Sequence, residues 1–403
     1  MLITPNFTRR TQNAPMHDPR LDQLAKVLVH YSIKAQPGQL IRISGPPVAA
    51  PAIAAVYAEV LKAGAHPLVR CAPDDLTELF YDLANDDQLG YVNPVLQHEV
   101  ETIDASIGFW AETNTKALSA VDPAKQGKAS AARRPIMDRF MERAAEDKLR
   151  WVGTMYPTNA SAQDAEMSLR QYADFVFSAG HLDKPDPAAE WTKIRDRQQL
   201  LTDYLNGKKQ VRFQSPNGTD LTVTVDGMKW VNCFGDCNFP DGEVFTGPNL
   251  SASDGGVNGV VRYSFPAVHN GHEAHGIELT FEKGRVTKAT ADKGEKFLLQ
   301  MLDQDEGARN LGEIAIGTNY AIQQYTKNTL FDEKIGGTFH AAVGAGYPET
   351  GNSNSSGLHW DMVCDLRSPE NGGVEQAGGT ITVDGEVISK DGRFVFDGWP
   401  GPA

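Results

Sequence analysis

In the first half of the chain, helix-type and strand-type patterns of apolar residues alternate. Apolar residues at helical spacing predict helices over residues 18–32, 50–63, 75–85, 136–147, 167–179 and 191–205. Short apolar runs between turn residues predict strands over residues 39–44, 66–71, 106–110 and 150–155. Strands separated by helices of this length favour a parallel sheet with helices on its faces.

The pattern changes after Lys208. Period-two runs broken by Asp-Gly, Lys-Gly and Asn-Gly turns predict antiparallel strands that begin near residues 210, 220, 229, 260, 276 and 378. One helix is expected among them, over residues 294–303. We therefore predict two domains: an α/β N-terminal domain (1–207) with a mostly parallel sheet, and a β-rich α+β C-terminal domain (208–403).

Composition narrows the classes of function. A chain of 403 residues is long for one core, which agrees with two domains. A formal net charge of −14 argues against a nucleic-acid partner. No apolar run is long enough to span a bilayer, and the first residues lack the apolar centre of a secretory signal. We expect a cytoplasmic protein with no membrane partner.

Two common kinds of site are not expected. No strand-to-helix junction carries a phosphate-binding glycine signature, and the Gly45-Pro46-Pro47 turn is no substitute for one. The four cysteines are too few and too scattered for a disulfide framework. Cys233 and Cys237 lie four residues apart without a second pair at zinc-finger spacing, so we interpret them as reduced structural thiols.

The segment 336–367 is the strongest candidate for chemistry. His340 lies in an apolar run, and His359-Trp360-Asp361 begins another. If the second run is a strand, His359 and Asp361 project from one face and Trp360 from the other. Imidazole and carboxylate together suit a hard or borderline divalent ion. A single histidine or aspartate in a strand is more often structural, so the grouping is what favours a metal.

Two glutamates add to this group. Glu243 and Glu313 are the acids of locally apolar, glycine-bounded segments, where an unpaired charge would be costly. With His340, His359 and Asp361 they make three carboxylates and two imidazoles, too many for one catalytic zinc. The set suits two metals about 3.5–4 Å apart that share a bridging carboxylate and activate a water as hydroxide.

The histidine-rich stretch at His269, His272 and His275 is a weaker metal candidate. Spacing of three would place these residues on one face of a helix, but Gly271, Gly276 and the following apolar run favour a turn and a strand. Neighbouring side chains would then point to opposite faces. We do not expect a metal there.

Several motifs in order resemble one family of enzymes. They include GEVFTGP, NGVVRYSFPA, DEGARNLGEIAIGTNY, FDEKIGGTFHAAVGAGYPETG and HWDMVCDLR, and they extend from about residue 156 to residue 396. These segments resemble the metal-dependent aminopeptidases of the aminopeptidase T / AmpS type, peptidase family M29. The resemblance implies an α/β domain, a β-rich domain with a two-metal site, and a homodimer whose cavity encloses the active sites.

The resemblance also implies roles for individual residues. The metal ligands would be Glu243, Glu313, His340, His359 and Asp361, with Glu313 as the bridging carboxylate and Glu333 as a sixth ligand or a nearby acid. Tyr347, in the YPETG turn, would hydrogen-bond the developing oxyanion. Carboxylate-rich ligation admits Zn, Co, Mn or Mg.

Three functions follow from this set of residues. The first is an exopeptidase that removes residues from peptides with a free N-terminus, with Glu313 or Glu333 carrying the proton to the leaving amine. The second is a two-metal hydrolase of another amide. The third is a protein without catalytic activity, in which an ion only stabilises the β-rich domain.

Overall fold

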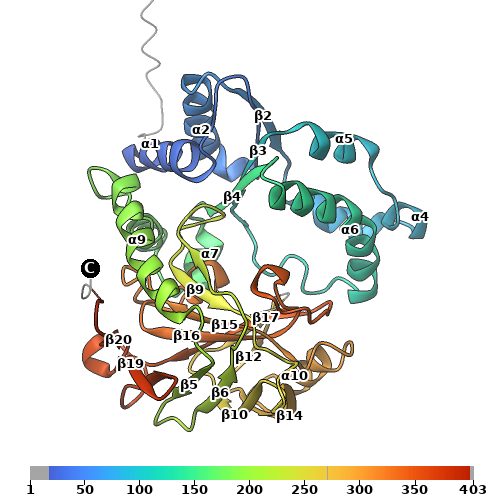
Figure 1. Cartoon of the computed structure of the whole chain (residues 1–403). Coiled ribbons are helices and arrows are strands. Elements are labelled where there is room, and N and C mark those ends of the chain that lie inside the picture. Colours follow the sequence, from blue (N-terminus) through green and yellow to red (C-terminus); the bar gives the residue numbers. More distant parts are fainter. Residues whose placement is uncertain (1–17, 270, 400–403) are drawn as a thin grey trace, which may run out of the picture.

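The parallel sheet predicted for the first half is present in the computed structural model, which describes residues 18–269 and 271–399 (Figure 1). Its five strands follow the order β2-β1-β3-β4-β8, with every neighbouring pair parallel. They are β1 (Leu40–Gly45), β2 (His66–Cys71), β3 (Ala105–Trp110), β4 (Arg150–Met155) and β8 (Asn238–Phe239). The first four strands confirm the predicted ones, whereas β8 was not predicted.

Helices cover both faces of this sheet. Ile41 and Ile43 of β1 share a core with the first two helices, whereas Leu40 packs with Val100 and Phe140 from helices on the other face. The helices are α1 (Pro19–Lys26), continued by the π-helix η1 (Val27–Ser32), η2 (Pro47–Ala49), α2 (Ala50–Lys62), α3 (Asp75–Leu83), α4 (Asp86–Leu89), α5 (Pro94–Thr102), α6 (Pro123–Ala145), α7 (Asn159–Asp164), α8 (Leu169–Ala179) and α9 (Pro187–Leu205). The six predicted helices are therefore confirmed in type.

One predicted helix is much too short. Helix α6 begins at Pro123, where Asp122 caps it by accepting a hydrogen bond from the Ala124 amide, and not near residue 136. Its first turns are mostly small or polar and show no apolar period, so only the packed half was visible in the sequence. Helices α4, α5 and α7 were not predicted.

The second half contains two large antiparallel sheets, which confirms the expected antiparallel strands; their division into two sheets was not predicted. The larger has the order β14-β13-β10-β6-β5-β18-β19-β20 and the smaller the order β17-β16-β15-β9-β7. The larger sheet contains β5 (Gln210–Gln214), β6 (Asp220–Thr224), β10 (Val257–Arg262), β13 (Glu278–Glu282), β14 (Arg285–Thr290), β18 (Thr380–Val383), β19 (Glu386–Lys390) and β20 (Arg393–Phe394). The smaller contains β7 (Val231–Cys233), β9 (Glu243–Thr246), β15 (Leu311–Gly317), β16 (Thr338–Gly344) and β17 (His359–Asp365).

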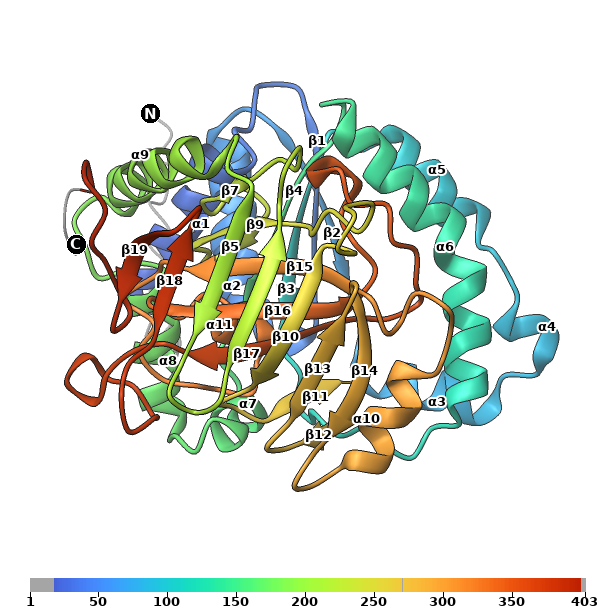
Figure 2. The same ribbon diagram turned by 60° about the horizontal axis from the view of Figure 1, so that its bottom comes forward.

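The two antiparallel sheets pack face to face. In Figure 2 the strands of the larger sheet lie in front of β15, β16 and β17 and run across them. Phe213 of β5 stacks on Phe339 of β16 with ring centroids 4.1 Å apart, inside one shared apolar core. One face of the smaller sheet is buried in that core, and the polar side chains of the sheet lie on its other face.

Short elements connect these layers. They are the hairpin β11 (Ala267–His269) and β12 (His272–Ala274), the helices α10 (Glu295–Leu302) and α11 (Thr329–Asp332), and the turns η3 (Pro348–Thr350) and η4 (Pro369–Asn371). Helix α10 confirms the predicted helix, but α11 shows that the expectation of one helix in this half was wrong. At four residues, α11 is too short to show a helical period.

Strand β8 links the two halves of the chain. Its residues follow the predicted boundary at 207, yet they pair with Gly153 and Thr154 of β4. The division into domains 1–207 and 208–403 stays a prediction. The start of the chain, on which the expectation of no secretory signal rests, lies outside the described residues. Among the described helices, none has the length and hydropathy to cross a membrane.

Candidate metal centre

The register of the smaller antiparallel sheet brings the predicted ligands to one face. Glu313 of β15 and Asp361 of β17 both pair with Ala342 of the central strand β16. Side chains opposite one another in a sheet share a face, so the two carboxylates flank the small side chain of Ala342. His340 and His359 lie two residues before Ala342 and Asp361 in their strands, and therefore project from the same face.

A β-bulge determines where Glu313 points. Leu311 pairs with the core residue Val343, but the register then shifts so that Glu313 pairs with Ala342. Without the extra residue, Glu313 would pair with Ala341 and face the apolar core. Gly312 is the residue that makes the shift possible, because a β-carbon there would lie 2.3 Å from the carbonyl oxygen of Ala345.

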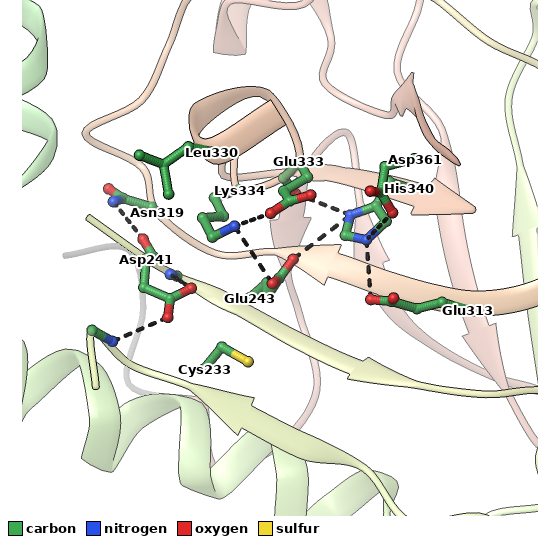
Figure 3. Close-up of polar contacts among 12 residues, drawn as sticks. Cys233, Asp241, Glu243, Glu313, Asn319, Leu330, Glu333, Lys334, His340 and Asp361 are labelled. Carbon is green, nitrogen blue, oxygen red and sulfur yellow. Dashed lines mark hydrogen bonds and ion pairs between the residues drawn. The ribbon is translucent and has the colours of Figure 1, made fainter. Parts of the chain in front are cut away.

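Six side chains form two groups of three whose donor atoms lie within 4.8 Å of one another. In the His359 half, Nε2 of His359 lies 3.3 Å from Glu313 Oε2 and 3.3 Å from Asp361 Oδ1. The Glu243 half consists of Glu243, Glu333 and His340. His340 lies between the halves: its Nε2, the nitrogen open to an ion, lies 3.2 Å from Glu313 Oε1, and its Nδ1 lies 3.8 Å from Glu243 Oε2 (Figure 3).

Backbone carbonyls orient both imidazole rings. His359 Nδ1–H donates to the Ala345 carbonyl at 2.8 Å, and His340 Nδ1–H donates to the Glu333 carbonyl at 3.2 Å. A carbonyl only accepts, so these contacts place the proton on Nδ1. The Nε2 atoms are thereby turned toward the carboxylates, as is usual for histidines that bind metals.

The chemistry of these groups fits divalent ions. Glu243 is 6% exposed, and its Oε2 has no hydrogen-bond partner among the described residues. A buried carboxylate oxygen without a partner is costly, and a cation bound there offsets the cost. Burial raises the pKa of Glu243 well above its usual value, and the charges of Lys334 and His340 only partly offset this effect.

The carboxylates act strongly on the two imidazoles. Burial alone lowers the pKa of His359, but Asp361 and Glu313 outweigh it and raise the pKa to about 12. Burial has the same effect on His340, where Glu313 and Glu243 raise the pKa to about 10. Without a bound ion both rings are therefore imidazolium near neutral pH.

Tyr347 lies at the open side of the His359 half. It directly precedes η3, and its ring centroid is 5.0 Å from that of His359 and 5.4 Å from that of Phe245. Partial burial, followed by the charges of Glu313 and Asp361, raises the pKa of Tyr347 far above its usual value. The phenol keeps its proton and can donate a hydrogen bond.

The structure adds one charged residue that the sequence analysis did not single out. Lys334 is fully buried and forms ion pairs with Glu333 and, at 3.6 Å, with Glu243. Burial lowers the pKa of Lys334, but Glu243, Glu333 and Asp241 outweigh it and raise the pKa well above the usual value. The sequence could have indicated Lys334, because it is a charged residue next to Glu333 in the same short segment before Gly336 and Gly337.

Two neighbours of Glu243 were also missed as site residues. Cys233 pairs with Glu243 across β7 and β9, so its side chain shares the polar face, and Asp241 completes a third cluster of possible ligands. All four cysteines are described and none is bonded to another, and the interpretation of Cys233 and Cys237 as reduced structural thiols stays a prediction. Burial raises the pKa of the Cys233 thiol well above its usual value, so it stays protonated.

The histidine-rich stretch forms the predicted turn and strands. His269 pairs with His272 across the β11–β12 hairpin, and His275 contacts Glu273 at 3.1 Å. Among the described residues, no potential metal cluster includes these three histidines. The first two rings pack on aromatic side chains instead. The ring centroid of His269 lies 5.6 Å from that of Trp360, and the ring centroid of His272 lies 4.9 Å from that of Phe297.

Comparison with known proteins identifies the family. The family described as thermophilic metalloprotease (M29) matches residues 17–394. This chain belongs to that family. The resemblance to M29 enzymes is thereby confirmed, and with it the expectation of an enzyme of the metallopeptidase class that uses a divalent metal.

Individual relatives of this M29 enzyme have similar length and fold. Aminopeptidase 2 of Geobacillus stearothermophilus is 28% identical over 94% of this chain and 98% of its own. Aminopeptidase T of Thermus thermophilus is 32% identical over 61% of this chain and 64% of its own. The solved structure of wild-type AmpT from Thermus thermophilus matches with a TM-score of 0.79 and 25% identity, over 94% of this chain and 99% of that one. This match confirms the combination of a parallel sheet with an antiparallel β-rich region.

Proposed function

We propose that this M29 enzyme is an aminopeptidase that uses two divalent ions to remove residues from peptides with a free N-terminus. The observation that carries the proposal is the pair of three-residue donor groups on one face of the smaller sheet. The relatives named aminopeptidases support the substrate class. The ions would be Zn, Co, Mn or Mg, because carboxylate-rich ligation admits each of them.

The proposed ligands are the six residues of the two halves: Glu243, Glu333 and His340, and Glu313, His359 and Asp361. Ions bound there would supply polarisation of the scissile carbonyl and a nucleophilic water at neutral pH. Glu313 is the proposed bridge, since Oε1 faces His340 at 3.2 Å while Oε2 faces His359 at 3.3 Å. One carboxylate thus reaches both halves of the centre.

The chain's own groups would handle the charge and the proton of the reaction. The Tyr347 phenol, protonated and beside His359, would donate to the oxyanion that develops on the substrate carbonyl. Glu313 or Glu333 would carry the proton to the leaving amine, because both acids belong to the donor groups. The negative site would also favour the cationic amino terminus of a peptide.

Peptide cleavage tests this function directly. Metal-stripped protein is incubated with matched free and N-acetylated peptides, with and without added Zn, Co, Mn or Mg. We expect release of the N-terminal residue only from free peptides and only with metal. Cleavage of acetylated substrates would favour the hydrolase of another amide, and metal binding without any cleavage would favour a structural ion.

The homodimer and the cytoplasmic location expected from the sequence are also proposals. Helix α3 supports an interface between copies, because Leu76, Leu79 and Leu83 lie on one of its faces and are exposed. Size-exclusion chromatography with light scattering would measure the mass in solution. A monomer at all concentrations would contradict the dimer.

A further inference from the structure

Lys334 lies inside the proposed metal centre and is paired with one half of it. Its side chain is fully buried, and Figure 3 shows its ammonium directed at Glu333 and Glu243. The ion pair with Glu243 spans 3.6 Å, to Oε1, while Oε2 of the same carboxylate has no hydrogen-bond partner in the described structure. One carboxylate oxygen is thus engaged by the Lys334 ammonium, and the other, with the His340 ring 3.8 Å away but no hydrogen bond, is the one available to a ligand.

The His359 half differs in this respect. Glu313 and Asp361 make their ion pairs with His359 and His340, and within residues 18–269 and 271–399 no lysine or arginine pairs with either acid. The Lys334 ammonium has three donors and no lone pair, so it cannot become a ligand and remains a cation 3.6 Å from Glu243. Among the described residues, a divalent cation therefore meets a permanent positive charge beside the Glu243 half and none beside the acids of the His359 half.

We propose that Lys334 is an internal cation that makes the two halves load unequally: the His359 half takes the first ion, and the Glu243 half takes the second ion more weakly, against the ammonium. The inference rests on the assignment of the two halves in the proposed function. It gives Lys334 a positioning role, because it acts through Glu243 and Glu333.

Formal charges agree with this arrangement. Counted as ionised, the carboxylates of Asp241, Glu243, Glu313, Glu333 and Asp361 carry the same total charge as two divalent ions and one ammonium. With one ion bound in the His359 half, Asp241, Glu243 and Glu333 still carry two more negative charges than Lys334 balances, so the second ion is attracted, but less than it would be without the ammonium. Only the second ion completes the balance, at a site already partly neutralised.

Asp241 provides a control of opposite sign. It is buried, its oxygens accept the amides of Gly235 at 3.2 Å and Gly242 at 2.9 Å, and its charge acts on Lys334. Asp241 therefore partly neutralises the charge of the Lys334 ammonium that acts on Glu243 and Glu333. Removing its charge lowers the attraction for a cation at Glu243 directly and also leaves the charge of Lys334 less neutralised.

Metal titration of the stripped full-length chain tests the proposal. Co²⁺ is added in competition with a chromophoric chelator, and both dissociation constants are fitted without any substrate. We expect two steps at least tenfold apart in the wild-type protein. In Lys334→Met the second step should tighten at least tenfold with the first unchanged, whereas Lys334→Arg should keep the wild-type separation.

Asp241→Asn should weaken the second step, in the direction opposite to Lys334→Met. Circular dichroism and a melting curve establish that each variant is folded before titration. Two equal sites in the wild-type protein, or a second step that Lys334→Met leaves unchanged or weakens, would overturn the proposal. A protein that binds two ions unequally but cleaves no peptide would refute the proposed aminopeptidase and leave this inference standing.

Discussion

Nε2 of His340 lies 3.2 Å from Oε1 of Glu313, and this contact joins the two halves of the metal centre. It exists only because the bulge at Gly312 turns Glu313 away from the apolar core. The proposed centre therefore depends on one local irregularity in an otherwise regular strand, and we expect Gly312, which has no functional group, to be a determinant of metal binding.

Replacing Gly312 by alanine should disrupt the centre. The new β-carbon would lie 2.3 Å from the Ala345 carbonyl, so the bulge must shift, at a cost of about 1–3 kcal/mol of stability. Metal content, measured by atomic emission, should fall below two ions per chain. Gly127→Ala is the matched control, because nothing lies within 4 Å of a β-carbon there, and it should keep full metal content.

Replacing Glu313 by glutamine should abolish turnover and lower metal content without unfolding the protein. The amide keeps the shape of the side chain but has one oxygen and no charge, so it cannot bridge two ions. Metal stoichiometry, activity and the melting temperature check this. Glu282→Gln, an exposed residue of β13, is the control. A Glu313→Gln variant with two ions and normal turnover would remove Glu313 from the site.

Tyr347→Phe should lower kcat by about a hundredfold or more, since loss of one oxyanion donor has effects of this size. The KM and the metal content should stay nearly unchanged, because the ring still packs on His359. Steady-state kinetics with one peptide measures the change, with the exposed Tyr91→Phe as control. An unchanged kcat would end the proposed role of Tyr347.

Metal binding should release protons. The pKa values of His340 and His359 are raised to about 10 and about 12, so both rings are charged at pH 7, whereas a ligand nitrogen must be neutral. Affinity should therefore rise as the pH increases from 6 to 8. Titration calorimetry in buffers of different ionisation enthalpy counts the protons, and a heat that does not depend on the buffer would contradict the prediction.

Sequence patterns are sufficient where one strand carries several ligands. His359 and Asp361 are two residues apart in β17, so alternation alone places them on one face and Trp360 in the core. The apolar, glycine-bounded surroundings of Glu243 and Glu313 likewise distinguish these two acids from ordinary surface glutamates.

Other features could not be read from patterns. Alternation along β15 would continue Leu311, Glu313 and Ala315 on one face, and only the pairing with β16 reveals the bulge. Lys334 lies in a short connection after α11, and its contact with Glu243 joins residues far apart in the chain. Strand β8 has two residues, which is too short for any periodicity.

The most direct test of the two-metal centre is a crystal structure of the protein loaded with Co²⁺ or Zn²⁺, with anomalous differences collected at the metal edge. We predict two peaks, one among Glu243, Glu333 and His340 and one among Glu313, His359 and Asp361, with Glu313 touching both. A single peak at full loading, or ions bound elsewhere, would contradict this prediction.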